Sequence, residues 1–551
     1  MSKATVSMKI GSDGVAIITM SNPPVNALAP AVIAGLKEKY AEAMSRRDVK
    51  AIVLTGESGK FSGGFDISVF IEVQKTGDLS VLPDVSVDLV MKTIEDAEKP
   101  SVAAIHGLAL GGGLELAMGC HARISTPDAL LGLPELSLGV IPGFGGTQRL
   151  PRLVGLQKAI EMMLLSKPIK AKEGYGNGLV DTIAPSEELL TVARRWALEI
   201  AEGRKAWRKT LDRTDRLSAL YETRQKLYAF RKDAERTPNM PQNQLCLDAI
   251  EEGVVHGGYA GVLKESRIFK ELVLSSTSKS LVHVFFALRA TSKVPNLTGV
   301  GLRPRPIRKV AIIGGGLMGS GIATALILSD IHVVLKERDP AFRGLKTVEA
   351  NLKGLVKKGP LTQEKMRKAL SLLKGVLDYS EFEYVDMVIE AVIENAPLKQ
   401  TIFNEVEKLC PPHCILATTT STIDLNIVGK NTNSQDRIIG AHFFSPAHVM
   451  PLLEIVWSEK TSPQVILDLM NIGKMMKKVP IVVQNCTVEK RFRLLGSDRG
   501  SKWQQELVRL EISAMCASQQ GREVGSCGFS VDFVGQSKTL GVFVDQERSL
   551  A

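Results

Sequence analysis

Short hydrophobic runs alternate with amphipathic stretches through the first third of the chain. Residues 16–19, 51–54 and 102–105 are apolar runs of strand length, and residues 31–43 carry apolar side chains at helical spacing. Strands that alternate with helices in this way are typical of an α/β domain. We therefore predict an α/β domain at residues 1–190.

The pattern changes between residues 187 and 288, where charged residues are frequent and Pro238 and Pro241 interrupt the chain. A mobile linker needs no buried face, whereas this stretch keeps apolar residues at Val254, Val262, Ile268, Phe269 and Leu272. We predict a helical extension and linker at residues 191–300, packed on the first domain. The following run GLRPRP, residues 301–306, is typical of a Pro-rich hinge.

A second α/β pattern begins after this hinge. The apolar run at residues 309–313 leads directly into Gly314, Gly316 and Gly319, and residues 321–328 continue as a helix-like run. Glycines spaced in this way between a buried strand and a helix are typical of a dinucleotide-binding turn. The cofactor pyrophosphate would rest on the N-terminus of that helix.

Glu337 follows the next apolar run, residues 332–335, about 20 residues beyond the glycines. A carboxylate there accepts hydrogen bonds from a ribose diol and repels a 2′-phosphate, which favours NAD over NADP. Lys336 beside it weakens that preference. We place this NAD-binding Rossmann domain at residues 301–487.

Two glutamates lie beside glycine-rich turns in the first domain. Glu115 ends the run GGGLE, Glu135 ends the run GLPE, and a further glycine pair lies in residues 61–66. Glycines let backbone N–H groups approach a substrate oxygen, and two such donors can hold a developing enolate. Two carboxyls near one carbon can act as base and acid. The pattern indicates acid/base chemistry on a thioester; the alternative is ordinary turn glycines and solvated glutamates.

The surrounding residues resemble a known family. Residues 102–117 and 139–150 are similar to the core motifs of the enoyl-CoA hydratase, or crotonase, family, and the similarity runs over about residues 5–190. The resemblance implies a crotonase-like α/β fold and the hydration of trans-2-enoyl-CoA.

By the same resemblance, the backbone amides of Gly63 and Gly112 form an oxyanion hole. Glu115 would activate water for attack on Cβ, and Glu135 would exchange the proton at Cα. Family members that only isomerise or hydrolyse often lack one of the two acids. Having both favours a hydratase, to which proton exchange by Glu135 would add enoyl-CoA isomerase activity.

The second half resembles the 3-hydroxyacyl-CoA dehydrogenase family. The similar runs are residues 389–395, 420–422 and 442–446. The resemblance implies that His442 takes the proton from the 3-hydroxyl, that Glu454 orients His442, and that Ser421 hydrogen-bonds the substrate oxygen. Glu390, in the first of these runs, is assigned to the cofactor site. A histidine suits the role of base because its ordinary pKa lies near neutral pH.

A hydratase followed by a dehydrogenase resembles the peroxisomal, or plant glyoxysomal, multifunctional β-oxidation family. We predict hydration of trans-2-enoyl-CoA to 3-hydroxyacyl-CoA and its oxidation by NAD to 3-ketoacyl-CoA. One alternative is a hydratase with a vestigial NAD domain. The other is a basic protein that binds RNA or the cytoskeleton.

Composition agrees with a folded, globular chain. Its 551 residues are 44% hydrophobic and 23% charged, and the formal net charge is +10 with a pI near 9.1. A basic surface attracts polyanions, among them coenzyme A phosphates and RNA. Aromatic residues make up only 5%, which argues against a stacking platform for single-stranded nucleic acid. We expect acyl-CoA substrates and at most weak RNA binding.

The seven cysteines form no regular framework, which indicates a reducing compartment. The run CPPHC at residues 410–414 has no second ligand pair, so we expect a turn with buried thiols and no metal site. No apolar run approaches membrane-spanning length. The sequence leaves acyl chain length and oligomeric state open.

The family resemblance ends near Thr487. Residues 488–551 are rich in Gly, Ser, Gln and Arg, and we expect them to be disordered. Without the helical domain that follows in the family, we expect NAD binding but weak oxidation. The family implies a peroxisome, but the ending Ser549-Leu550-Ala551 lacks a Ser-Lys-Leu-type signal, so the chain by itself is expected to stay cytosolic.

Overall fold

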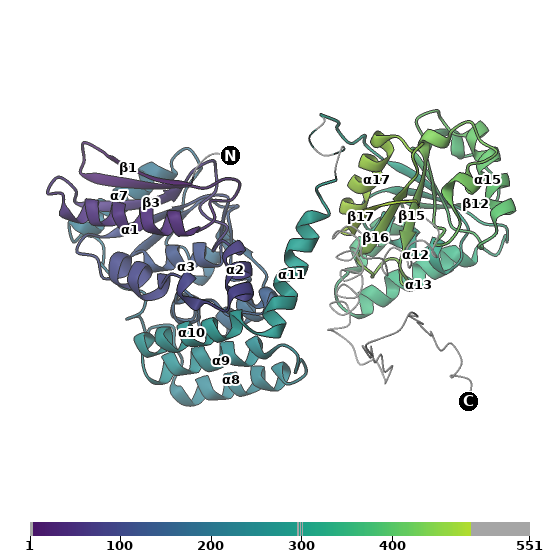
Figure 1. Cartoon of the computed structure of the whole chain (residues 1–551). Helices are drawn as coiled ribbons and strands as arrows, with labels where there is room; N and C mark the ends of the chain where they lie inside the picture. The colour runs from purple at the N-terminus through teal and green to yellow at the C-terminus, as the bar shows by residue number, and fades with distance from the viewer. Residues whose placement is uncertain (1–3, 295–296, 298, 300, 486–551) are drawn as a thin grey trace, which may run out of the picture.

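The computed structural model describes residues 4–294, 297, 299 and 301–485. Within them, an N-terminal α/β body and a helical extension precede a second α/β body, and α11 leads from the first body toward the second (Figure 1). No helix in these ranges is long and apolar enough to cross a membrane. The expectation of a disordered tail at residues 488–551 concerns residues outside the described ranges.

The first body is built on a six-stranded sheet and a small three-stranded sheet. The strand order of the large sheet is β1 (Thr5–Ile10), β2 (Val15–Ser21), β3 (Ala51–Gly56), β4 (Ser101–Ile105), β6 (Ala122–Ser125), β9 (Thr182–Ile183). The order of the small sheet is β5 (Leu108–Leu110), β7 (Leu130–Gly132), β8 (Ile169–Lys170). The remaining elements are α1 (Pro30–Ser45), α2 (Ser68–Thr76), η1 (Leu79–Val81), η2 (Val85–Glu95), α3 (Gly112–Gly119), η3 (Glu135–Leu138), α4 (Gly146–Val154), α5 (Leu156–Leu164) and α6 (Ala171–Asn177).

Burial explains why the strand predictions hold. Strands β3 and β4 are buried along their whole length, because the large sheet is covered on both faces. One face packs into a core with Ile52, Leu54 and Leu36, and the other packs against α7 (Leu189–Ala201) through Val53 and Val102. Within the large sheet, β2, β3, β4, β6 and β9 pair in parallel, and only β1 is antiparallel. The predicted α/β domain is confirmed.

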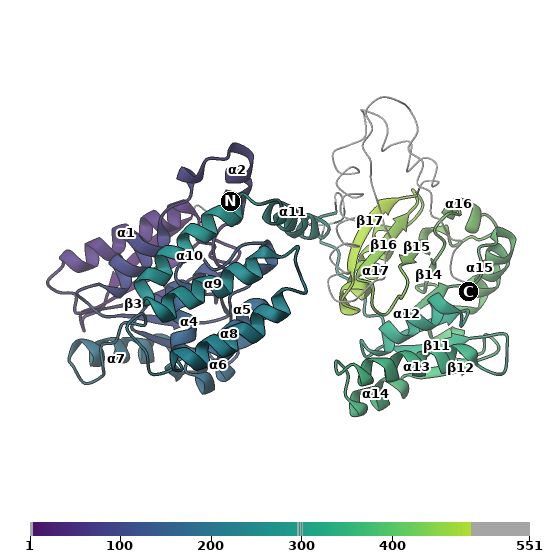
Figure 2. The same cartoon turned by 90° about the horizontal axis from the view of Figure 1, so that it is seen from below.

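The charged region after this body is helical, as the apolar spacing predicted. Its helices are α7 (Leu189–Ala201), α8 (Leu220–Ala234), α9 (Pro241–Val255), α10 (Gly258–Val273) and α11 (Ser276–Ala290). Helices α8, α9 and α10 lie side by side, and α9 and α10 also contact α4 of the first body (Figure 2). The extension therefore forms one wall of the first body.

The second body is an eight-stranded sheet between helices. The strand order is β12 (Leu373–Val376), β11 (His332–Lys336), β10 (Lys309–Ile313), β13 (Met387–Glu390), β14 (Ile415–Thr418), β15 (Ile438–Phe443), β16 (Leu452–Trp457), β17 (Val479–Gln484). Its helical elements are α12 (Leu317–Ile327), α13 (Arg343–Lys357), α14 (Gln363–Leu370), η4 (Phe382–Tyr384), α15 (Ala396–Leu409), α16 (Leu425–Val428), η5 (Gln435–Arg437) and α17 (Pro463–Met475). From β12 to β15 the strands are parallel, in the order of a dinucleotide-binding fold. The order reverses between β10 and β13, where such folds bind their ligand.

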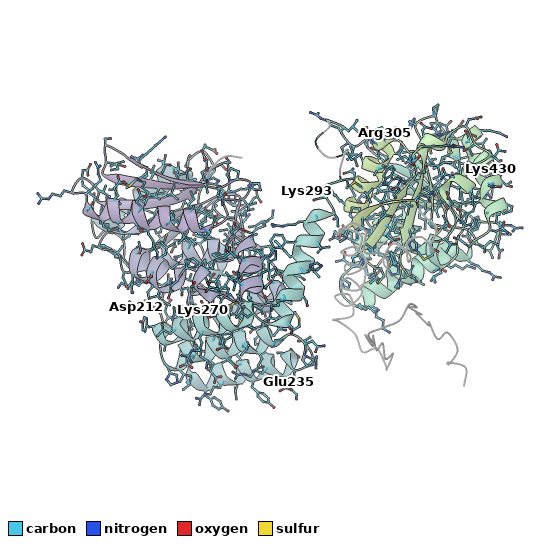
Figure 3. All side chains as sticks on the ribbon, in the orientation of Figure 1. Asp212, Glu235, Lys270, Lys293, Arg305 and Lys430 are labelled. Carbon is cyan, nitrogen blue, oxygen red and sulfur yellow. The ribbon has the colours of Figure 1, made fainter. Side chains whose placement is uncertain are left out.

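The Pro-rich run before the second body is tied to that body. Arg305 donates from its backbone amide and its guanidinium to the buried carboxylate of Asp468 on α17, both at 2.7 Å. Lys293, just after α11, lies between the two bodies, and Arg305 lies on the second body (Figure 3). Any hinge motion must therefore take place before Arg305.

Candidate active sites

Strands β5 and β7 bring the two predicted glutamates together. These strands pair in parallel, with Leu110 opposite Gly132, and the Gly111 amide donates to the Gly132 carbonyl at 2.8 Å. Glu115 lies in the first turn of α3, directly after β5, and Glu135 begins η3, directly after β7. The carboxyl ends of two paired strands therefore direct both side chains toward one site.

The Glu115 carboxylate is buried and held by backbone amides. Its side chain is 1% exposed, and Oε1 accepts hydrogen bonds from the amides of Phe144 at 2.8 Å and Gly146 at 2.7 Å. Burial raises the pKa of Glu115 to about 7, against these hydrogen bonds and the nearby Arg149 charge, which lower it. Such a carboxyl changes between its ionised and neutral forms near neutral pH.

Glu135 lacks the hydrogen bonds that hold Glu115. Its Oε2 atom is covered and has no hydrogen-bond partner among the described residues. Burial raises the pKa of Glu135 well above its ordinary value, and the charges of Glu115 and Glu265 raise it further. Burial and the two neighbouring carboxylates therefore favour the protonated form of Glu135, and its covered oxygen is placed to contact a bound molecule.

The oxyanion-hole prediction needs one correction. The Gly63 amide donates to the Val25 carbonyl at 2.7 Å, so it is not available to a substrate. The segment does approach Gly112, since a Cβ on Gly64 would lie 3.4 Å from the Gly112 nitrogen. Gly112 begins α3, and the first amides of a helix have no acceptor within it. Among the described residues no group accepts from the Phe65 amide, so Phe65 and Gly112 are the free donors here.

The glycine loop of the second body has the shape that a dinucleotide needs. Gly314 follows β10 with a φ of +106°, and a Cβ there would meet the Ala391 carbonyl at 2.7 Å. A Cβ on Gly319 would lie 1.8 Å from the Gly314 carbonyl, so α12 packs closely on the loop. Gly316 caps α12 without a side-chain hydrogen bond and has open space around it. The N-terminus of α12 can therefore take a phosphate group.

Glu337 fits the ribose side of the cofactor. It follows β11, is 7% exposed, and its Oε2 accepts from the Gly344 amide at 3.0 Å. Its Oε1 is buried and has no hydrogen-bond partner among the described residues, so it can accept a hydrogen bond from a ribose hydroxyl. The Lys336 ammonium lies 4.5 Å from the ring centre of Tyr379. That contact turns Lys336 toward the aromatic ring.

His442 and Glu454 form the pair that the sequence predicted. They face each other across the antiparallel strands β15 and β16, and His442 Nδ1 lies 2.8 Å from Glu454 Oε2. Glu454 is 4% exposed, whereas His442 is half-buried and its ring contacts Phe444. With Nδ1 occupied, the other ring nitrogen is the one that can receive a proton.

The assignment of Glu390 to the cofactor is corrected. Glu390 is fully buried, and its carboxylate accepts from Lys399 at 2.8 and 2.9 Å, from Thr418 at 2.7 Å and from the Val392 amide at 2.8 Å. It anchors the turn after β13 and does not reach a cofactor. Ser421, by contrast, is exposed just after β14.

Glu394 is a residue that sequence reasoning missed, although it ends the same IEAVIE run. It is half-exposed and accepts from the hydroxyls of Thr420 and Thr422, on either side of Ser421. Of the two acids in that run, Glu394 is the one that solvent can reach, whereas Glu390 is buried.

The two thiols at residues 410–414 are buried, as the sequence predicted. Cys410 and Cys414 are free and buried. In the described ranges, no group of three or more His, Cys, Asp or Glu side chains could hold a metal ion.

Comparison with known proteins decides the family. Residues 11–245 match the model for enoyl-CoA hydratase/isomerase, and residues 309–486 match that for the NAD-binding domain of 3-hydroxyacyl-CoA dehydrogenase. The chain is 69% identical over 485 residues to a peroxisomal fatty acid beta-oxidation multifunctional protein of Oryza sativa, covering 88% of this chain and 67% of the relative. The chain belongs to this multifunctional β-oxidation family.

Two further relatives agree. An Arabidopsis thaliana peroxisomal multifunctional protein is 66% identical, over 88% of this chain and 68% of its own length. A Cucumis sativus glyoxysomal multifunctional protein is 60% identical, over 88% of this chain and 67% of its own length. The predicted fusion of a crotonase-like hydratase domain with an NAD-binding dehydrogenase domain is confirmed, and both alternative functions are less well supported. The domain boundaries stay predictions; the hydratase match runs beyond residue 190, into α9.

Proposed function

We propose that Glu115 and Glu135 hydrate trans-2-enoyl-CoA. The ionised Glu115 takes a proton from water as the water oxygen bonds to Cβ. The electron pair of the double bond moves toward the thioester carbonyl, whose oxygen receives hydrogen bonds from the Gly112 and Phe65 amides. Protonated Glu135 then supplies the proton that bonds to Cα, which gives 3-hydroxyacyl-CoA. Solvent exchange restores both carboxyls to their starting forms.

One observation carries this proposal: two covered carboxyls at the ends of paired strands β5 and β7, of which only Glu115 is held by amides. Backbone amides and Arg149 favour the ionised form of Glu115, whereas the charges of Glu115 and Glu265 favour the protonated form of Glu135, which suits one for base and one for acid. The same acid, Glu135, would move the Cα proton in an enoyl-CoA isomerase reaction.

Isomerisation separates the two roles experimentally. We expect Glu115→Gln to keep isomerase activity on a 3-enoyl-CoA while it loses hydration, because isomerisation adds no water. Glu135→Gln should lose both activities. If Glu115→Gln loses isomerisation as completely as Glu135→Gln does, the division of roles is wrong.

We further propose that the second body oxidises the 3-hydroxyacyl-CoA product. The glycine loop at Gly314 to Gly319 and Glu337 would hold NAD, which would supply the hydride acceptor for the oxidation at C3. His442 receives the proton of the 3-hydroxyl, Glu454 supports the resulting positive charge, and Ser421 hydrogen-bonds the substrate oxygen. NADH formation from 3-hydroxyacyl-CoA, and its loss in His442→Gln, tests this role.

We propose that the chain acts in the peroxisome or glyoxysome, the compartments named for its relatives. The ending Ser549-Leu550-Ala551 lies outside the described residues, and the expectation that the chain alone stays cytosolic is tested separately. A fluorescent protein fused ahead of Met1 tests the proposed compartment: a punctate peroxisomal signal supports it, and a diffuse cytosolic signal contradicts it.

A further inference from the structure

A third buried carboxyl, Glu265 on α10, contacts the same loop as Glu115. The loop amides alternate between the two acids: those of Phe144 and Gly146 donate to Glu115, and those of Gly145 and Thr147 donate to Glu265. The distances from Glu265 to the Gly145 and Thr147 nitrogens are 2.5 and 2.8 Å, and the Thr147 hydroxyl donates at 2.6 Å. Each carboxylate thus fixes every second amide of one turn.

The backbone makes this alternation specific. Gly145 has a φ of +94°, which turns its amide away from the amides on either side of it. The loop runs into the N-terminus of α4, where unpaired amides favour a negative charge. One carboxylate alone would leave half of these buried donors unsatisfied, which is costly. Glu115 can therefore keep its place only while something else accepts from Gly145 and Thr147.

Glu265 is held firmly by the helical extension. It is fully buried on α10, and Gln148 of α4 donates to the Ala249 carbonyl of α9 at 2.7 Å. Arg149 of α4 donates to the Phe144 carbonyl at 3.0 Å, so the loop is fixed from a further side. The helical extension thus contributes one side chain, that of Glu265, to the loop that holds Glu115.

We propose that Glu265 is a positioning residue for hydration: by binding the Gly145 and Thr147 amides, it holds the loop that fixes the base Glu115. The inference rests on the proposed role of Glu115. Glu265 also faces other charged or titratable groups: Glu115 on α3, Glu135 on η3, Cys246 on α9 and, beside Gly145, Arg149 on α4. Burial and the charge of Glu115 raise the pKa of Glu265 to about 8, and a charge on Glu265 raises the pKa of Glu135.

The test compares full-chain variants in the hydration assay. Glu265→Gln keeps the shape but offers one acceptor oxygen, so we expect kcat to fall by about 10²-fold through misplacement of Glu115. KM should change little, because Glu265 does not contact the substrate. A fall in kcat at a nearly unchanged KM separates misplacement of the base Glu115 from a loss of substrate binding or a general loss of folded protein.

Two further variants make the result decisive. Thr147→Val removes one donor to Glu265 at little change in volume, and we expect a smaller fall in kcat. Glu252→Gln on α9, whose carboxylate pairs with Lys264 at 3.0 Å on the surface of the same extension, is the matched control and should behave as wild type.

Wild-type kcat in Glu265→Gln would overturn the proposal. If that variant does not fold, wild-type kcat in Thr147→Val overturns it instead. A fully active Glu115→Gln variant would contradict the proposed function itself, which separates the two failures.

Discussion

The two sites of this chain reach acid/base chemistry near neutral pH by different routes. The hydratase site uses carboxyls whose pKa is raised by burial, and the position of Glu115 depends on backbone amides about 30 residues away in the chain. The dehydrogenase site uses a partly buried histidine, His442, and one carboxylate, Glu454, as its partner. A carboxyl needs the surrounding fold to make it a useful base, whereas a histidine needs mainly orientation.

The largest expected effect is at the buried pair. Glu115→Gln and Glu135→Gln keep the side-chain shape but remove proton transfer, so hydration should slow by about 10²–10⁴-fold in each. The measurement is loss of enoyl-CoA absorbance, with Glu173→Gln on α6, a surface partner of Lys158, as control. Hydration at wild-type speed in both variants would show that the acids are misassigned.

Substitutions of His442 and Glu454 in the dehydrogenase site should slow NADH formation by different amounts. His442→Gln removes the base and should slow NADH formation by about 10²-fold or more, while Glu454→Gln keeps the base and should cost less. Hydration should be unchanged in both variants. An equal loss in the two variants would mean that the carboxylate does more than orient the ring.

The pH dependence should separate the sites further. Glu115 must be ionised to act as base, and its raised pKa of about 7 means that the active form is lost as pH falls below that value. We expect kcat/KM for hydration to fall by roughly tenfold per pH unit below pH 7. A flat profile down to pH 5 would show that burial does not tune this carboxyl.

The smallest effect is expected at the cofactor site. Glu337→Gln keeps one acceptor but loses the charge that binds a ribose diol, so NAD affinity should fall by about tenfold. Discrimination against NADP should weaken as well, since the repulsion of a 2′-phosphate is gone. Calorimetric titration with both cofactors measures this, and unchanged selectivity would remove Glu337 from the ribose site.

Local patterns predicted the elements and most of the site. Buried strand β3 and the glycine loop at Gly314 could be predicted because their signal lies within a few residues. The errors concern hydrogen-bond partners that lie far away in sequence. Nothing near Gly63 shows that Val25 takes its amide, and Glu265 lies 120 residues from Gly145.

The glutamate assigned to the cofactor shows a second limit. Glu390 and Glu394 belong to one run, but Glu390 ends strand β13 and is buried, whereas Glu394 lies beyond the strand and is partly exposed. A buried lysine, Lys399, binds Glu390 and removes it from the site. Charge alone in a sequence cannot distinguish an anchor from a ligand contact.

One measurement tests most directly that the chain holds two independent sites. Glu115→Gln is given NAD with either trans-2-enoyl-CoA or 3-hydroxyacyl-CoA, and NADH is followed. We predict that NADH formation from the enoyl substrate falls by about 10²-fold or more, while formation from the hydroxy substrate stays at the wild-type rate. An equal fall with both substrates would contradict two independent sites.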